Sequence, residues 1–377
     1  MNKKSQEKKR TIGIDARFYG PRQKGLGRYV QKLIDNLEKV DLSNQYIIFL
    51  RKENWLEYQP KNPNFKKVLA DYPWYGFKEQ FLMPFKIRQQ RIDLMHFPHF
   101  NLPVFCFSPF VVTIHDLVLR RFPTRRASKL SPMGYWLKNL AYRIVISSAV
   151  SRSKKIITVS NYTKGDILKY FKVGPDKIKV VYQGRPDENV KSVAVKGNIA
   201  KPYLLYVGNA YPHKNLERLV FAFKRLVDDH QMSLRLVLVG EVDHFYKRLK
   251  NTCPRALLDK IIFTDFLPDD DLNNLYQNAS VYVFPSLYEG FGLPPLEAMS
   301  HGLPVVSSKA ACLPEILGQA AIYFNPEDAS EMAGQIKKVL TDEETRQKLI
   351  SLGQQKIKEY NWTETALQTL ELYRAVD

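Results

Sequence analysis

Cysteines and long apolar runs are both scarce in this 377-residue chain. The three cysteines lie far apart, and no nearby histidine or cysteine completes a zinc-binding pattern, which argues against a disulfide framework and a zinc knuckle. No segment has about 18 uninterrupted apolar residues, and the basic N-terminus lacks the apolar stretch of a signal peptide. We therefore expect a cytoplasmic protein without a transmembrane helix.

Acidic residues are also few. The chain has 57 lysines and arginines but only 38 aspartates and glutamates, which gives a net charge of +19. This excess predicts an anionic partner. Residues 117–165 contain no acidic residue at all, and apolar side chains alternate with the basic ones there at roughly helical spacing. These apolar residues are Tyr135, Trp136, Leu137, Leu140 and Ile144.

Two interpretations of residues 117–165 remain open. The segment could form a helix that lies on an anionic membrane surface, or a helix whose apolar side packs into the core while its bases face water. Nucleic acid fits less well, because no helix-turn-helix, zinc finger or RNA-binding aromatic signature is present.

Length and element order predict two α/β domains. The chain is too long for one ordinary domain, and short apolar runs alternate with amphipathic stretches in both halves, which indicates parallel sheets covered by helices. The alternation of apolar and amphipathic segments stops over residues 183–201, as expected for a linker between domains. We therefore predict an N-terminal domain over 1–190, a second domain over 191–361, and a final helical segment over 362–377. Strands are expected at 11–16, 45–50, 111–114, 155–159, 203–207, 234–239, 260–264, 280–284 and 304–307.

The most informative segment is residues 284–302, FPSLYEGFGLPPLEAMSHG. An apolar strand leads into a glycine-flanked loop and then into a helix near Pro294. This arrangement can bind an anion, because the unpaired N–H groups at the start of a helix are directed towards the loop. Glu289 and Glu297 flank this loop and would repel a phosphate, so hydroxyl groups of a sugar or ribose are better partners for them. The alternative is that both glutamates are ordinary helix-start and turn residues.

A second candidate is the segment YVGNAYPHKNL, where a strand is followed by a loop that carries Lys214 into a helix. A lysine in this position can neutralise a diphosphate and stabilise charge on a leaving group.

Residues 284–302 resemble the Glu-x-Phe-Gly-x-x-x-x-Glu signature of glycosyltransferase family 4, whose members are retaining enzymes with the GT-B fold. The resemblance extends through Leu313-Pro-Glu-Ile and Asn325-Pro-Glu-Asp and covers nearly the whole chain. It implies two Rossmann-like doubly wound domains that face each other across a cleft, with a C-terminal helix that braces both. It also implies that no metal cofactor is needed, and that Asp269 to Asp271 start a helix instead of binding a cation.

The resemblance assigns roles to individual residues. Glu297 would bind the donor ribose, Glu289 and the backbone of the following loop would hold the transferred sugar, and Lys214 would bind the diphosphate. His115, at the end of an expected strand, would contact the transferred sugar or the acceptor. The catalytic set is thus His115, Lys214 and Glu289, and the donor site is completed by Gly25, Gly27, Asn209, His213, Phe266, Gly290, Phe291, Gly292, Leu293 and Glu297.

The sequence around Gly292 is similar to that of mannosyl- and rhamnosyltransferases of bacterial polysaccharide assembly. It therefore implies transfer of a hexose, with GDP-mannose as the expected donor, to a glycan or lipid-linked acceptor. It also implies a peripheral position at the inner face of the plasma membrane. Alternatives are a sugar-nucleotide epimerase or phosphorylase of the same fold, and a nonenzymatic module that binds anionic surfaces.

Overall fold

The computed structural model describes residues 9–124, 131–185 and 199–376, which form two compact units. Within these ranges, unit 1 comprises residues 9–117, 131–184 and 361–376, and unit 2 comprises 118–124, 185 and 199–360. Residues 118–124 were expected in the first domain. They belong with unit 2 because Phe122 packs against Tyr288, with ring centroids 5.9 Å apart.

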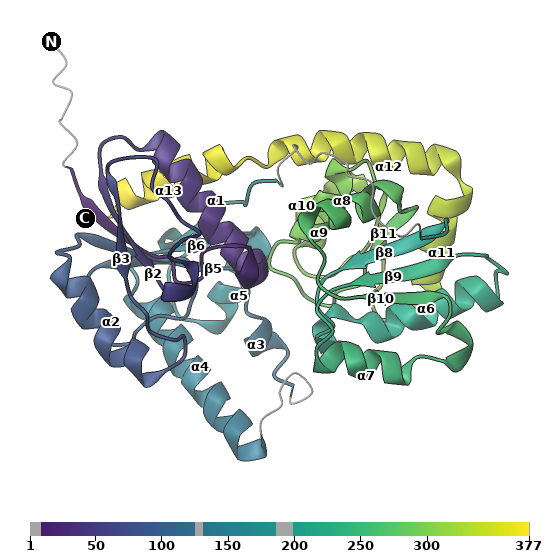
Figure 1. Cartoon of the computed structure of the whole chain (residues 1–377), viewed down its shortest axis with the longest axis horizontal. Coiled ribbons are helices and arrows are strands. Elements are labelled where there is room, and N and C mark those ends of the chain that lie inside the picture. Colours follow the sequence, from purple (N-terminus) through teal and green to yellow (C-terminus); the bar gives the residue numbers. More distant parts are fainter. Residues whose placement is uncertain (1–8, 125–130, 186–198, 377) are drawn as a thin grey trace, which may run out of the picture. The chain divides into compact units, whose positions relative to one another are not determined.

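Unit 1 is built on a parallel sheet of seven strands in the order β3-β2-β1-β4-β5-β6-β7 (Figure 1). The interior strands β4 and β5 are buried along their whole length, as expected for a parallel sheet covered on both faces. The strands are β1 (Thr11–Asp15), β2 (Gln45–Leu50), β3 (Phe65–Leu69), β4 (Leu94–Phe97), β5 (Phe110–Ile114), β6 (Lys155–Thr158) and β7 (Ile178–Val180).

Two hydrophobic cores lie in unit 1. The first joins α1 to the C-terminal helix α13, whose Trp362, Leu370 and Tyr373 are buried there. The second contains residues of α2 and α4 together with the loop that follows β4. The helices of unit 1 are α1 (Lys24–Val40), α2 (Phe77–Gln89), α4 (Pro132–Arg152), α5 (Asn161–Tyr170) and α13 (Trp362–Arg374).

Unit 2 has a parallel six-stranded sheet in the order β10-β9-β8-β11-β12-β13. Its strands are β8 (Tyr203–Val207), β9 (Arg235–Val239), β10 (Ile261–Thr264), β11 (Val281–Phe284), β12 (Val305–Ser308) and β13 (Ala321–Phe324). Its helices are α3 (Val118–Arg121), α6 (Leu216–Asp228), α7 (His244–Thr252), α8 (Asp269–Asn278), α9 (Leu293–Ser300), α10 (Leu313–Leu317), α11 (Ala329–Thr341) and α12 (Glu343–Lys356).

The glycine-rich segment after β1 runs into helix α1. Helix α1 begins at Lys24, so Gly25 and Gly27 lie in its first turn. A Cβ atom on Gly27 would lie 2.0 Å from the carbonyl oxygen of Gly20, so only glycine fits this close backbone approach. A Cβ on Gly25 would meet nothing within 4 Å.

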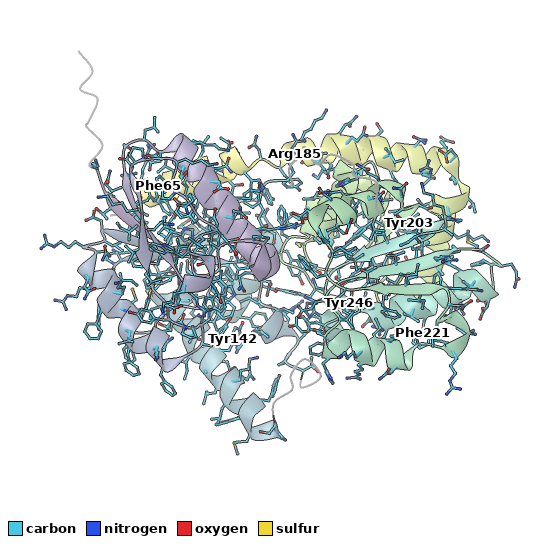
Figure 2. All side chains as sticks on the ribbon, in the orientation of Figure 1. Phe65, Tyr142, Arg185, Tyr203, Phe221 and Tyr246 are labelled. Atoms are coloured by element: carbon cyan, nitrogen blue, oxygen red, sulfur yellow. The ribbon has the colours of Figure 1, made fainter. Side chains whose placement is uncertain are left out.

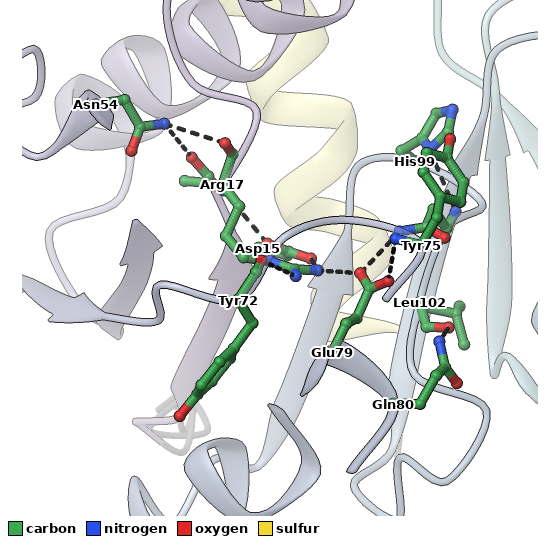
Figure 3. A network of polar contacts seen from close by, with 11 residues as sticks. Asp15, Arg17, Asn54, Tyr72, Tyr75, Glu79, Gln80, His99 and Leu102 are labelled. Carbon is green, nitrogen blue, oxygen red and sulfur yellow. Dashed lines mark hydrogen bonds and ion pairs between the residues drawn. The ribbon is translucent and has the colours of Figure 1, made fainter. Parts of the chain in front are cut away.

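A buried ionic network stabilises the carboxyl end of β1 (Figure 3). The guanidinium of Arg17 is fully buried and donates to Asp15 at 2.7 Å and to Glu79 at 2.6 Å. Asn101 donates to the same Glu79 oxygen at 2.7 Å. Burial alone would lower the pKa of Arg17, but the two carboxylates raise it on balance, so this charge is held in the core by its partners.

Candidate active site

The candidate site of unit 2 lies where the strand order reverses. β8 and β11 are neighbours in the sheet, although two strands separate them in sequence. In doubly wound folds, ligands bind beyond the carboxyl ends of the strands at this switch point. The loop after β8 carries Lys214 and the loop after β11 carries Glu289, so the topology brings the two predicted residues to one place.

Lys214 and Glu289 form a direct ion pair. Lys214 Nζ donates to Glu289 Oε1 at 2.6 Å, and the two side chains are only 16% and 13% exposed. The ammonium also lies 5.8 Å from the centroid of the Phe284 ring. An ammonium has three N–H donors, and the glutamate engages one of them. The pair therefore holds the lysine head in place while leaving it chemically able to bind an anion.

Backbone and amide contacts join the two loops. Leu287 N donates to the carbonyl of His213 at 2.7 Å. Asn215 adopts a left-handed conformation with φ of 63°, and its buried amide donates to the carbonyls of Pro285 at 3.0 Å and Pro326 at 2.7 Å. Asparagine tolerates this conformation better than most residues. Asn215 thus fixes the turn that positions Lys214, a role that the sequence analysis missed.

The start of α9 offers fewer N–H groups than expected. Pro294 and Pro295 occupy its first turn and have no N–H, so Gly292 and Leu293 supply the helix-terminal N–H groups. Gly292 has a φ of 99°, and a Cβ there would lie 2.9 Å from Leu313 Cδ2, so glycine is required.

Phe291 faces inward in this loop. Its ring is 4% exposed and packs edge-on against Tyr360 at 5.4 Å, while its carbonyl accepts from Cys312 Sγ at 3.3 Å. Any contact between Phe291 and a ligand would therefore come from the backbone. Gly290, the preceding predicted residue, is also buried.

Glu297 lies on the following turn of α9 and is oriented by an aromatic neighbour. Tyr276 from α8 donates its hydroxyl to Glu297 Oε2 at 3.0 Å, and the same ring stacks on His301 at 5.1 Å. His301 Nδ1 lies 2.8 Å from the carbonyl of Glu297. The sequence analysis did not identify Tyr276, because a tyrosine in an amphipathic helix looks like an ordinary core residue.

The remaining predicted donor residues of unit 2 lie at the ends of β8 and β10. The carbonyl of Asn209 accepts from Tyr206 at 2.8 Å, and the ring of His213 stacks on Tyr211 at 6.0 Å. Burial, with a smaller effect of Lys214, lowers the pKa of His213 to about 4, so this imidazole is neutral at pH 7. Phe266 is largely exposed, next to Asp265, which accepts from its backbone N–H at 2.7 Å.

His115 belongs to unit 1, where it follows β5. Its Nε2 donates to the carbonyl of Pro98 at 2.9 Å, its Nδ1 lies 3.3 Å from Gln183 Nε2, and Tyr29 packs edge-on against the ring at 4.6 Å. Burial lowers the pKa of His115 to about 4. The ring is therefore a neutral, oriented imidazole at pH 7.

An acidic cluster and a buried histidine have structural places in the fold. Asp269, Asp270 and Asp271 form the first turn of α8, which confirms that they start a helix. His96 is fully buried between the hydroxyls of Tyr373 at 2.6 Å and Thr113 at 2.8 Å, and has a structural role. In the parts of the chain that the structure covers, no three His, Cys, Asp or Glu side chains are grouped to hold a metal ion.

The two Rossmann-like units have the GT-B fold of solved glycosyltransferases. The solved structure of sucrose-phosphate synthase from Thermosynechococcus elongatus matches 97% of this chain and 99% of its own, with a TM-score of 0.76 at 21% identity. Anabaena HepE in complex with UDP and glucose covers 97% of this chain and 99% of its own, with a TM-score of 0.72 at 19% identity.

Sequence comparison identifies the family. Residues 191–356 match the family described as Glycosyl transferases group 1, and residues 24–189 match Glycosyltransferase Family 4. O-antigen chain mannosyltransferase B of Escherichia coli is 30% identical over 302 residues, which is 76% of each chain. O-antigen chain mannosyltransferase RfbU of Salmonella typhimurium is 30% identical over 230 residues, 60% of this chain and 63% of its own length. The chain belongs to the family 4 glycosyltransferases, and it is a hexose-transferring enzyme.

Proposed function

We propose that this enzyme transfers mannose from GDP-mannose, with retention at the anomeric carbon, to a hydroxyl of a glycan or lipid-linked acceptor in polysaccharide assembly. The observation that carries this proposal is the Lys214–Glu289 pair at the switch point of a nucleotide-binding fold. The mannosyltransferase relatives support the choice of sugar.

Each residue of the pair has a distinct part in this proposal. Lys214 binds the donor diphosphate and stabilises the negative charge that builds up on it as the sugar departs. Glu289 and the backbone of Gly290 to Leu293 bind hydroxyls of the transferred sugar, while Glu297, oriented by Tyr276, accepts hydrogen bonds from the ribose. The acceptor proton goes to the departing phosphate, so no protein nucleophile is assigned.

Other sequence-derived assignments remain predictions. We expect Asn209, His213 and Phe266 to contact the nucleotide, and Gly25, Gly27 and His115 to act from unit 1. We also propose that the reaction needs no metal ion, since Lys214 and the loop N–H groups can supply the positive charge that a cation would otherwise provide. The cytoplasmic location expected from the separated cysteines is part of the same proposal.

A thermal-shift screen without added metal tests the nucleotide site directly. Ligands are GDP, UDP, dTDP, ADP and their sugar conjugates, and binding to the folded state raises the melting temperature. A selective rise with GDP and GDP-mannose supports the proposal. A rise with UDP ligands alone would move the donor to a UDP-sugar, and no rise with any nucleotide would contradict the proposed nucleotide site.

Product analysis then separates the enzymatic alternatives. Incubation with GDP-mannose and a mannose-containing acceptor should yield GDP and an extended glycan in equal amounts. Conversion of the sugar nucleotide without an acceptor would indicate an epimerase, and dependence on inorganic phosphate would indicate a phosphorylase.

A further inference from the structure

Unit 1 carries a concentration of large apolar side chains that face solvent. Eleven of the 23 exposed large hydrophobic residues of the described chain lie on α2, the loop that follows β4, and α4. We call this set the apolar face. It consists of Phe77, Phe81, Leu82, Phe85, Phe105, Phe107, Met133, Trp136, Leu137, Leu140 and Ile144.

Helix α2 is apolar on both sides. Met83 and Ile87 are buried in the core of unit 1, while Phe77, Phe81 and Phe85 repeat every four residues on the opposite side. This spacing places the three phenylalanines in one row along the helix. Phe77 is 86% exposed and Phe85 is 66% exposed.

Helix α4 decides against one of the two sequence interpretations of residues 117–165. Its C-terminal half packs into the core through Tyr142 (Figure 2), Ile146, Ala149 and Val150. None of the residues 132–141 is buried, and this N-terminal half extends away from the sheet of unit 1 in Figure 1. Trp136 is 57% exposed, so the interpretation that these apolar residues pack in the core is wrong.

The loop that follows β4 contacts both helices. Gln80 of α2 accepts from Val104 N at 2.8 Å, and Phe81 stacks on Phe105 with ring centroids 6.0 Å apart. Arg152 at the end of α4 donates to the carbonyls of Val104 and Cys106 in the same loop. The loop therefore links α2 to α4, and the buried sides of both helices share one core.

The elements that carry the apolar face expose charges of a single sign. Helix α4 and loop residues 98–108 contain no acidic residue. The one carboxylate on α2, Glu79, is fully buried against Arg17. The basic residues on the two helices are Lys78, Lys86, Arg88, Lys138, Arg143 and Arg152.

We infer that the apolar face docks on an anionic lipid bilayer. Phenylalanine, tryptophan and leucine rows bordered by lysine and arginine suit the boundary between acyl chains and headgroups. A second copy of the chain fits this surface less well, because a two-fold symmetric contact would bring the basic residues of both copies close together. Among the residues the structure describes, no helix is long and apolar enough to cross a membrane, so the contact is a surface attachment.

Vesicle co-sedimentation of the full chain tests this inference. Vesicles of phosphatidylcholine alone are compared with vesicles in which about a third of the lipid is phosphatidylglycerol. We expect the wild type to sediment with the anionic vesicles, and less so at high salt, where the Debye length falls to about 3 Å at 1 M. The triple variant Phe77→Ser/Phe85→Ser/Phe107→Ser should bind more than about tenfold more weakly.

Charge and position are controlled separately. Lys78→Glu/Lys138→Glu should remove the preference for anionic vesicles. Phe221→Ser, on α6 of unit 2 (Figure 2), removes a phenylalanine that is 57% exposed elsewhere and should leave vesicle binding unchanged. The apolar face is on unit 1 and the proposed nucleotide site is on unit 2. All variants should therefore keep the rise in melting temperature with the nucleotide that stabilises the wild type. The same rise shows that each variant is folded.

Three results would overturn the inference. The wild type could stay in the supernatant with anionic vesicles, or the triple variant could bind them as well as the wild type does. Alternatively, sedimentation velocity could reveal a wild-type dimer that the triple variant dissociates while neither protein binds vesicles, which would make the apolar face a contact between copies. Each result is independent of whether the donor site binds GDP.

Discussion

Replacement of Lys214 by alanine should separate catalysis from folding. The ammonium donates to Glu289 at 2.6 Å in a position that is 16% exposed, so its removal leaves a largely buried carboxylate without its cation. A loss of this kind costs about 1–3 kcal/mol of folding free energy. The effect on turnover should be larger, about 100- to 1,000-fold, because the lysine would stabilise charge that develops only in the transition state.

The assay measures release of GDP from GDP-mannose at saturating acceptor, together with the melting temperature of each variant. Lys214→Arg keeps the positive charge and should recover part of the turnover. Glu289→Gln removes the same ion pair but keeps the ammonium, so its melting temperature controls for the structural loss. Turnover by Lys214→Ala within about twofold of the wild type would refute the role of the lysine.

Three other changes test features that the structure revealed. Tyr276→Phe removes the hydrogen bond that orients Glu297. Initial rates should show a KM for the donor that is raised about tenfold, with little change in kcat. An unchanged KM would count against ribose binding by this glutamate. Arg17→Met leaves two carboxylates buried without a cation and should lower the free energy of unfolding by about 3–5 kcal/mol in urea titrations, whereas a loss below about 1 kcal/mol would contradict the network of Figure 3. His96 should make the free energy of unfolding depend on pH, because burial lowers its pKa from 6.5 to about 3. Between these values the unfolded chain takes up a proton that the folded chain does not. The free energy of unfolding therefore falls by about 1.4 kcal/mol per pH unit as pH drops from about 6 towards 4. His96→Gln should make the pH dependence of unfolding shallower, and an unaltered slope would disprove this origin.

Local sequence patterns determined much of the fold. Interior strands of a parallel sheet are short apolar runs, and β2 and β8 were predicted with their observed bounds for that reason. Three of the strands that were missed, β3, β7 and β13, lie at sheet edges, where one side is exposed and the apolar run is broken. The fourth, β4, is fully buried but contains a histidine, whose burial depends on partners far away in the sequence.

The candidate site divides in the same way. Glycine and proline positions in residues 284–302 already specify a tight loop at a helix start, because backbone conformation is a local property. That Lys214 contacts Glu289, or that Tyr276 orients Glu297, depends on the order of strands in the sheet.

The exposure of α4 is also a tertiary result. Apolar residues at helical spacing look the same in a sequence whether they meet a core or solvent, since periodicity records a face and not its partner. The sequence by itself determined the two α/β domains, the family signature and the charge of residues 117–165. Only the tertiary structure decided which apolar rows face outward and which charged residues meet, because both depend on packing between segments far apart in the chain.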